Sequence, residues 1–168
     1  MQRVAENSLN LDIGIREVPA RFLACVHHTG PFVGNSMLFE GLFARVLGWA
    51  GARSLIHPVM ERIAVFHNDP ELTPPEELRM SVGITVPPDV LPEDGVDILE
   101  IPAGAYAVAS GVVRFDQHNA AWWELMGEWL PCSGWCLRNE SNFEVIRNVS
   151  STLLGSHHIE LWVPVQTR

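Results

Sequence analysis

Two glutamates occupy apolar stretches whose residue pattern is typical of β-strands. Glu144 lies within Phe143–Ile146, and Glu61 opens a second stretch of the same kind. A carboxylate among apolar strand residues must find a charged partner, face solvent or titrate abnormally. Glu144 is therefore a candidate for binding a cation or for acid–base chemistry, and a solvent-facing glutamate is the alternative.

The alternation of a strand decides which neighbours share the face of Glu144. Ile146 and Asn148 follow it at two-residue spacing, so we expect them on the same face. Phe143 and Val145 fall on the other face, which we expect to lie under the helices. The sequence thus predicts that Glu144 points away from the helical layer.

The aromatic residues indicate what Glu144 would bind. The chain has six Trp, seven Phe and one Tyr, which is more than two helical stripes require. Trp123 stands beside a residue of the second helical stripe, and Trp162 alternates with Leu161 and Val163. Aromatic walls around a buried carboxylate favour a lipophilic cation, which gains apolar burial, cation–π contact and charge pairing together. Partly exposed tryptophans at the edge of the core are the alternative.

A shift of 83 positions aligns the chain with itself. Residues 17–20 (Glu-Val-Pro-Ala) then match residues 100–103 (Glu-Ile-Pro-Ala), and Glu61 matches Glu144. Fourteen positions of the first half are identical to their partners, where about five would match by chance. The sequence predicts a single domain over residues 1–168, with a first repeat at about 11–88 and a second at about 94–168.

Each repeat has the pattern of strand, helix, strand, strand. In the first repeat we expect strands at 13–28, 61–67 and 78–86, and a helix that follows the N-cap Ser36 and ends at Gly51. In the second we expect strands at 98–114, 143–148 and 159–165, and a helix that follows the N-cap Asn119. The predicted fold class is α+β, a tandem duplicated β-α-β-β with pseudo-twofold symmetry and two helices packed on antiparallel sheets.

Charge and hydropathy exclude several classes of function. The net charge of -9 and the lack of a Lys/Arg cluster argue against direct nucleic-acid binding and favour a cation as partner. No stretch approaches the roughly 20 apolar residues of a membrane span, and residues 1–10 have no signal-peptide pattern. We therefore expect a cytoplasmic protein that does not bind membranes.

Signals for metals, cofactors and catalysis are weak in the sequence. Cys132 and Cys136 have no second pair of ligands nearby, and the adjacent histidines at 27–28 and 157–158 point to opposite faces of a strand. We expect no metal and no cofactor. The motifs of serine hydrolases, phosphate-binding loops and metalloproteases are also missing, so the sequence does not predict an enzyme.

Several short motifs follow one another along the chain. They are Phe66-His67-Asn68-Asp69-Pro70, Thr85-Val86-Pro87, Gly104-Ala105-Tyr106-Ala107-Val108, Phe143-Glu144-Val145 and Ile159-Glu160-Leu161-Trp162-Val163. In this order they resemble the DNA gyrase inhibitor family, also called the GyrI-like or SbmC-like small-molecule-binding family. That family is related to the effector-binding domains of AraC-type and MerR-type regulators.

The resemblance implies a central groove that binds amphipathic, often cationic compounds, with a groove glutamate that matches Glu144. Because the segment before Asp12 is too short for a DNA-binding domain, we expect a stand-alone protein that holds lipophilic or cationic compounds between the two repeats and protects against toxins. The ligand-binding residues that we expect are Glu144, Trp123, Trp162, Phe66, Ile146 and Glu61.

Two alternatives also follow from the resemblance. Some members of the family bind DNA gyrase, so a gyrase-binding inhibitor or modulator is one. Other relatives hydrolyse reactive genotoxins, so a hydrolase with Glu144 as its catalytic residue is the other. In the family a tyrosine often follows the glutamate by two residues, and Ile146 stands at that position here, which makes the hydrolase alternative weaker.

Overall fold

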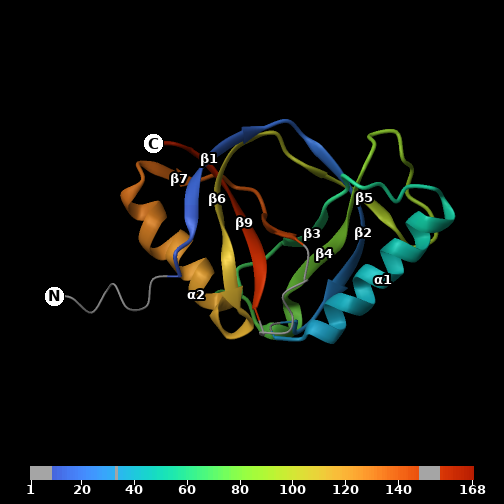
Figure 1. The fold of residues 1–168 in the computed structure, drawn as a ribbon, viewed down its shortest axis with the longest axis horizontal. Helices are drawn as coiled ribbons and strands as arrows, with labels where there is room; N and C mark the ends of the chain where they lie inside the picture. The colour runs from blue at the N-terminus through green and yellow to red at the C-terminus, as the bar shows by residue number, and fades with distance from the viewer. Residues whose placement is uncertain (1–8, 33, 148–155) are drawn as a thin grey trace. The chain divides into compact units, whose positions relative to one another are not determined.

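A computed structural model describes residues 9–32, 34–147 and 156–168 (Figure 1). These ranges contain nine strands and two α-helices, and every strand pair with a known register is antiparallel. The predicted α+β class is confirmed. No helix in the described part of the chain is long and apolar enough to cross a membrane. The described chain divides into two compact units.

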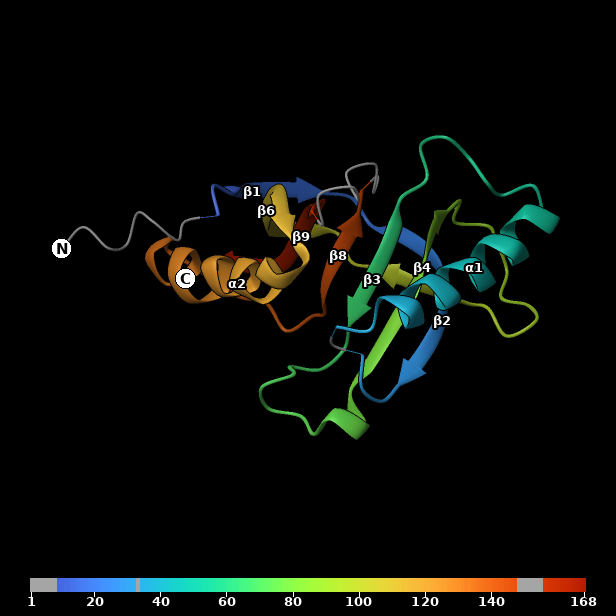
Figure 2. The same ribbon diagram turned by 60° about the horizontal axis from the view of Figure 1, so that its bottom comes forward.

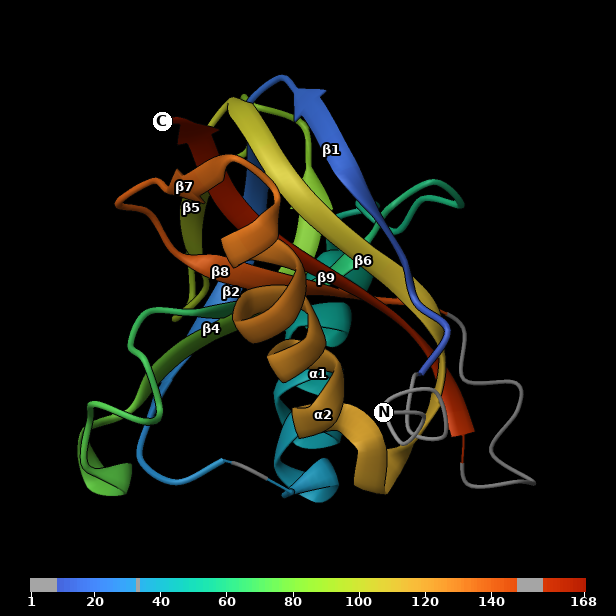
Figure 3. The ribbon, with the colours of Figure 1, turned by 90° about the vertical axis from the view of Figure 1, so that its left-hand side faces the viewer.

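The first unit holds most strands of the C-terminal half together with the first strand of the chain. Its strand order is β1-β6-β9-β8, and β7 also pairs with β9. Helix α2 is preceded by a 3₁₀ turn and continues into a π-helical segment and another 3₁₀ turn (Figure 3). The bounds are β1 Asp12–Val18, β6 Gly104–Arg114, η2 Phe115–Gln117, α2 His118–Trp123, η3 Glu124–Trp129, η4 Leu130–Cys132, β7 Trp135–Leu137, β8 Asn142–Ile146 and β9 Ser156–Thr167.

The core of the first unit lies between β9, β6 and the α2 region. Alternate residues of β9, Ile159, Leu161 and Val163, are completely buried and belong to the same apolar cluster as Ala121 and Leu125. Because side chains alternate along a strand, the odd-numbered residues of β9 face α2 and the even-numbered ones face away. The face of β9 on which a side chain lies therefore determines whether it is near α2 or on the opposite side of the sheet.

The second unit is built in the same way around the first helix. Its strand order is β3-β4-β2-β5, and α1 lies along β2 and β4 (Figure 2). Val46, Trp49 and Ala50 of the helix are buried with Ala24, Val26 and Ile84 of the strands. The bounds are β2 Arg21–Thr29, α1 Ser36–Ala52, β3 Arg62–Phe66, η1 Pro75–Glu77, β4 Arg79–Val86 and β5 Asp97–Ile101.

Both predicted helix caps are off by one or two residues. Asn35, rather than Ser36, caps α1, because its side-chain oxygen accepts a hydrogen bond from the Leu38 backbone N–H at 3.1 Å. Asn119 lies inside α2, which begins at His118 directly after a 3₁₀ turn. Because the 3₁₀ turn leads directly into α2, the helix starts before Asn119 and needs no cap at that residue.

The two long strands predicted at 13–28 and 98–114 are each two strands, which corrects the sequence prediction. The breaks fall at Pro19-Ala20 and at Pro102-Ala103, inside the repeated Glu-Val-Pro-Ala and Glu-Ile-Pro-Ala motifs. Proline has no N–H to donate to a ladder, so pairing stops there. On its two sides the chain belongs to different units: β1 pairs with β6, whereas β2 pairs with β5.

Gly83 makes a close backbone approach in the middle of the second unit. It lies in β4 opposite Cys25 of β2 and Ile63 of β3, and a Cβ atom there would overlap the carbonyl oxygen of Ala24. Gly14 in β1 is the matched control, since a Cβ at that position meets nothing within 4 Å.

We therefore expect Gly83→Ala to lower the free energy of unfolding by about 3 kcal/mol, because the overlap forces two paired strands apart. Gly14→Ala should change it by less than about 0.5 kcal/mol. Urea denaturation followed by circular dichroism measures both. Equal stabilities of the two variants would show that the β2–β4 spacing is not fixed by Gly83.

Candidate functional site

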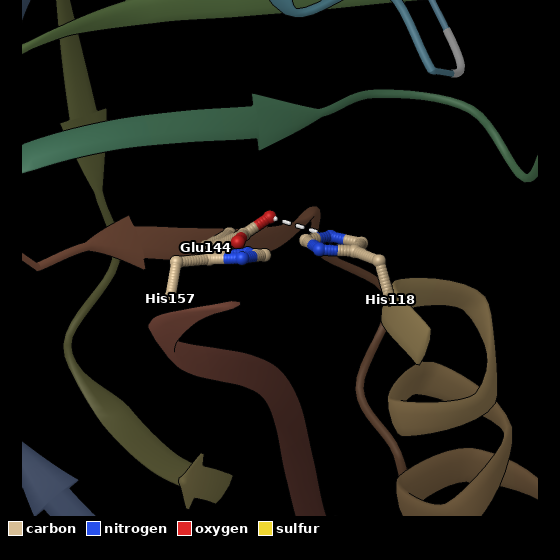
Figure 4. A group of neighbouring side chains, drawn as sticks. All are labelled: His118, Glu144 and His157. Carbon is tan, nitrogen blue, oxygen red and sulfur yellow. Dashed lines mark ion pairs between the residues drawn. The ribbon is translucent and has the colours of Figure 1, made fainter. Parts of the chain in front are cut away.

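Glu144 is one of two nearly buried carboxylates among the described residues of the first unit. The residue is 6% exposed and lies in the middle of β8. Its Oε2 atom is 3.0 Å from Nε2 of His118, the first residue of α2. His157, from the start of β9, completes the group (Figure 4), and the three side chains bring their donor atoms within 4.8 Å of one another.

The position of these partners reverses the predicted orientation of Glu144. His157 is an odd-numbered residue of β9, on the same face as Ile159 and Leu161, which pack against α2. Glu144 contacts His118 of α2 and therefore faces the helix rather than pointing away from it. The prediction failed because Phe143 and Val145 are buried as well, so apolar residues do not mark the helical face. Asn148 lies outside the described residues.

The pKa values of the two histidines beside Glu144 are shifted in opposite directions. Burial alone would lower the pKa of His118, but the hydrogen bond to Glu144 and the charge of Glu144 outweigh it and raise that pKa. Burial lowers the pKa of His157, and the nearby charge of His118 lowers it further. Their rings are stacked at 5.7 Å between centroids. The group therefore binds a proton more tightly at His118, beside Glu144, than at His157.

Glu160 is the second buried carboxylate, and it lies on the other face of β9. It is 4% exposed and accepts hydrogen bonds from Nη2 of Arg147 at 3.0 Å and from Nε1 of Trp162 at 2.8 Å. Arg16 of β1 adds an ion pair at 3.7 Å. The Trp162 ring also meets the Tyr106 ring edge-to-face. Two guanidinium groups, which carry their charge at any physiological pH, neutralise this carboxylate.

The structure places the predicted tryptophans in two different environments. Trp162 is 3% exposed and belongs to the Glu160 group, on the face of β9 opposite His157. Trp123 is 61% exposed at the end of α2, and its ring covers Gly127, where any side chain would collide with it. Ile146, half-buried, shares the strand face of Glu144. Glu160 was missed as a candidate, although the 83-residue shift pairs it with Glu77.

The remaining predicted residues, Glu61 and Phe66, lie in the second unit. Glu61 forms an ion pair with Arg21 at 2.8 Å, and both side chains are largely buried. Phe66 stacks on Phe32 with ring centroids 5.6 Å apart. Glu61 thus has an arginine partner where its repeat partner Glu144 has a histidine.

The second unit also contains a chain of hydrogen bonds that sequence reasoning did not detect. Ser81, completely buried, bonds Nδ1 of His27 at 2.7 Å and Nε2 of His67 at 2.6 Å. His27 continues to Asp97 at 2.9 Å, and Ser141 lies 3.4 Å from Nδ1 of His67. Strand pairing brings these residues together, since His27 lies opposite Ser81 in the β2–β4 ladder. Ser81 is too deeply buried to serve as a nucleophile.

One set of tautomers satisfies the whole chain of bonds. If His27 donates from Nε2 to Asp97, its Nδ1 accepts the Ser81 hydroxyl proton, and Ser81 in turn accepts from Nε2 of His67. Burial lowers the pKa of His67, and the charges of Arg79 and His27 lower it further.

In the α+β fold of the first unit, one nearly buried carboxylate, Glu160, lies beside the Trp162 ring, and the other, Glu144, lies beside His118. The family model described as "GyrI-like small molecule binding domain" matches residues 11–166. The chain belongs to this GyrI-like family, as its motifs predict.

One relative supports the same assignment, and two solved structures share the fold. A protein from Erwinia billingiae (strain Eb661) named "DNA gyrase inhibitor" is 33% identical over 160 residues, which cover 94% of this chain and 97% of that protein. The crystal structure of the EcmrR C-terminal domain is similar with a TM-score of 0.74 and 15% identity, covering 95% of this chain and 99% of that one. The structure of SAV2435 bound to tetraphenylphosphonium is similar with a TM-score of 0.59 and 10% identity, covering 92% and 94%.

The lowered pKa of His67 predicts how stability depends on pH. Below about pH 6.5 the unfolded chain binds a proton that the folded state resists, so this group makes stability fall as pH decreases and restores it above that pH. In His67→Gln, whose amide can still donate to Ser81, the fall between pH 7 and pH 5 should be smaller than in wild type. Melting temperatures across this range measure the difference.

The exposed His158 supplies the matched control. His158→Gln should keep the pH dependence of the wild type. If His67→Gln and wild type lose the same stability between pH 7 and pH 5, His67 is not held neutral by the fold.

Proposed function

We propose that this GyrI-like domain binds a lipophilic organic cation beside Glu144. One observation carries the proposal: among the described residues, the charged partner that Glu144 contacts is a histidine, whereas Glu160 contacts two arginines. A buried carboxylate requires a compensating charge. Guanidinium groups supply it permanently, but an imidazole supplies it only when protonated. Glu144 is therefore the buried carboxylate whose countercharge a ligand can replace.

The approach to Glu144 suits a ligand that is both apolar and cationic. The His118 side chain remains 31% exposed, so solvent reaches part of the ring that contacts the Glu144 carboxylate. Ile146 offers apolar surface on the same strand face. The charge of -9 raises the local concentration of cations around the protein. The similar SAV2435 was solved with tetraphenylphosphonium, which is a lipophilic cation, and this supports the choice of ligand class.

The other residues expected at the ligand keep a less direct role in this proposal. Trp123 is exposed on the α2 side of the unit and is available for aromatic contact. Trp162 and Glu61 have partners of their own, and Phe66 is stacked on Phe32. Their participation, the groove between the repeats, the single domain and the role in toxin protection stay predictions.

Tetraphenylphosphonium should bind wild-type protein and should bind Glu144→Gln at least about tenfold more weakly, because a buried charge-assisted contact contributes about 1.5–3 kcal/mol. Isothermal titration calorimetry measures both dissociation constants. Glu128→Gln, which removes the same charge from an exposed position in η3, should bind as wild type does. Tetraphenylborate has the same shape and the opposite charge, and it should not bind. Equal affinity of wild type and Glu144→Gln would refute the proposal.

A gyrase-directed role is the second candidate, and the 33% identity to a protein named "DNA gyrase inhibitor" over nearly the whole chain favours it. The purified protein should then reduce supercoiling of relaxed plasmid by a bacterial DNA gyrase. The assay needs bovine serum albumin at equal concentration as its control. Unchanged supercoiling at a tenfold excess over gyrase would eliminate this candidate.

A further inference from the structure

The group of His118, Glu144 and His157 has the composition of a metal site. Its three side chains come from α2, β8 and β9, and one donor atom of each lies within 4.8 Å of the others. Nε2 of His118 is already 3.0 Å from Oε2 of Glu144. Figure 4 shows the three side chains converging from separate elements. All three belong to the first unit, so the group is formed within one compact part of the chain.

Two imidazoles and one carboxylate select a particular class of ion. Nitrogen donors suit zinc and neighbouring transition metals, whereas Mg²⁺ and Ca²⁺ prefer sets of oxygen donors. In tetrahedral zinc sites, metal–ligand bonds of about 2.0–2.2 Å place the donor atoms about 3.3 Å apart. The observed separations, from 3.0 Å to at most 4.8 Å, reach that spacing by rotations of the side chains. A fourth position then remains for water or another ligand.

The surroundings favour binding at this position over a chance surface cluster. Glu144 is nearly buried, so its charge attracts a cation with little screening by water. The strand that carries His157 is fixed by Ile159 and Leu161. Ala121 of α2 and Leu125 of the following η3 segment belong to the same core cluster and fix the helix. Both backbones are therefore held while the side chains adjust. The His118 side chain is 31% exposed, so one member of the group is in contact with solvent.

We propose that His118, Glu144 and His157 bind one divalent transition-metal ion of the Zn²⁺ class. The inference goes beyond the proposed function, because it requires no organic ligand and adds His157, which that function does not use. Since both ions would neutralise the same carboxylate, bound Zn²⁺ and a lipophilic cation should exclude one another.

Calorimetric titration of EDTA-treated, dialysed protein with ZnCl₂ tests the site. We expect one ion per chain, and no heat of binding with MgCl₂ at the same concentrations. Co²⁺ should produce the intense visible bands of a tetrahedral site without a thiolate charge-transfer band, because the donors are nitrogen and oxygen. A thiolate band that disappears in Cys132→Ser/Cys136→Ser would assign the ion to the cysteines and overturn the proposal.

Variants at adjacent positions of β9 provide the matched comparison. His157→Gln should weaken Zn²⁺ binding by more than about 100-fold, beyond the loss typical of residues that only support a ligand. His158→Gln, on the opposite and exposed side of the strand, should bind as wild type does. Circular dichroism verifies the fold of each variant, and His118→Gln repeats the test if His157→Gln does not fold. Full Zn²⁺ affinity in a folded His157→Gln or His118→Gln would overturn the proposal.

The same variant separates this inference from the proposed function. His157→Gln should still bind tetraphenylphosphonium, whereas Glu144→Gln should bind neither ion. Loss of Zn²⁺ binding with tetraphenylphosphonium binding intact supports the metal site on its own. Zn²⁺ binding without any tetraphenylphosphonium binding in wild type would uphold the metal site and refute the organic-cation function.

Discussion

The burial of negative charge within a β-sheet is the constraint on which the first unit depends. Glu144 and Glu160 are both nearly inaccessible to water, and each needs a cation close by. Glu160 obtains two arginines and a tryptophan N–H on one face of β9. Glu144 obtains a histidine from the start of α2 on the other face. The charge of Glu160 is therefore compensated permanently. The compensation of the Glu144 charge depends on which cation is present beside it.

The path of the chain explains how arginines from distant parts of the sequence reach their carboxylate partners. Proline ends the pairing of β1 with β6 and the pairing of β5 with β2. After each proline the chain continues into the other compact unit. Arg16 of β1 is thereby brought beside Glu160 of β9, although the two residues are far apart in the sequence. In the second unit, Glu61 holds Arg21, which follows the same break. The repeated Glu-Val-Pro-Ala and Glu-Ile-Pro-Ala motifs thus determine where the ionic partners fall.

Residue patterns predict the local parts of this structure well. The apolar stripes locate both helices, and alternation correctly places Glu144 inside a strand. Alternation states which residues share a face, however, and not which face a helix covers. Because both faces of β8 are buried, the apolar Phe143 and Val145 gave the wrong orientation. His118 and the His27–Ser81–His67 chain depend on contacts between distant segments, which no local pattern encodes.

The location of a bound lipophilic cation tests the central claim most directly. Tetraphenylarsonium has the shape and charge of tetraphenylphosphonium, and its arsenic atom is located in a crystal by anomalous scattering. We expect an arsenic peak beside the carboxylate of Glu144, on the α2 face of β8, with the ring of His118 displaced from its position 3.0 Å from that carboxylate. A peak beside Glu160 and Trp162, on the opposite face of β9, would contradict it.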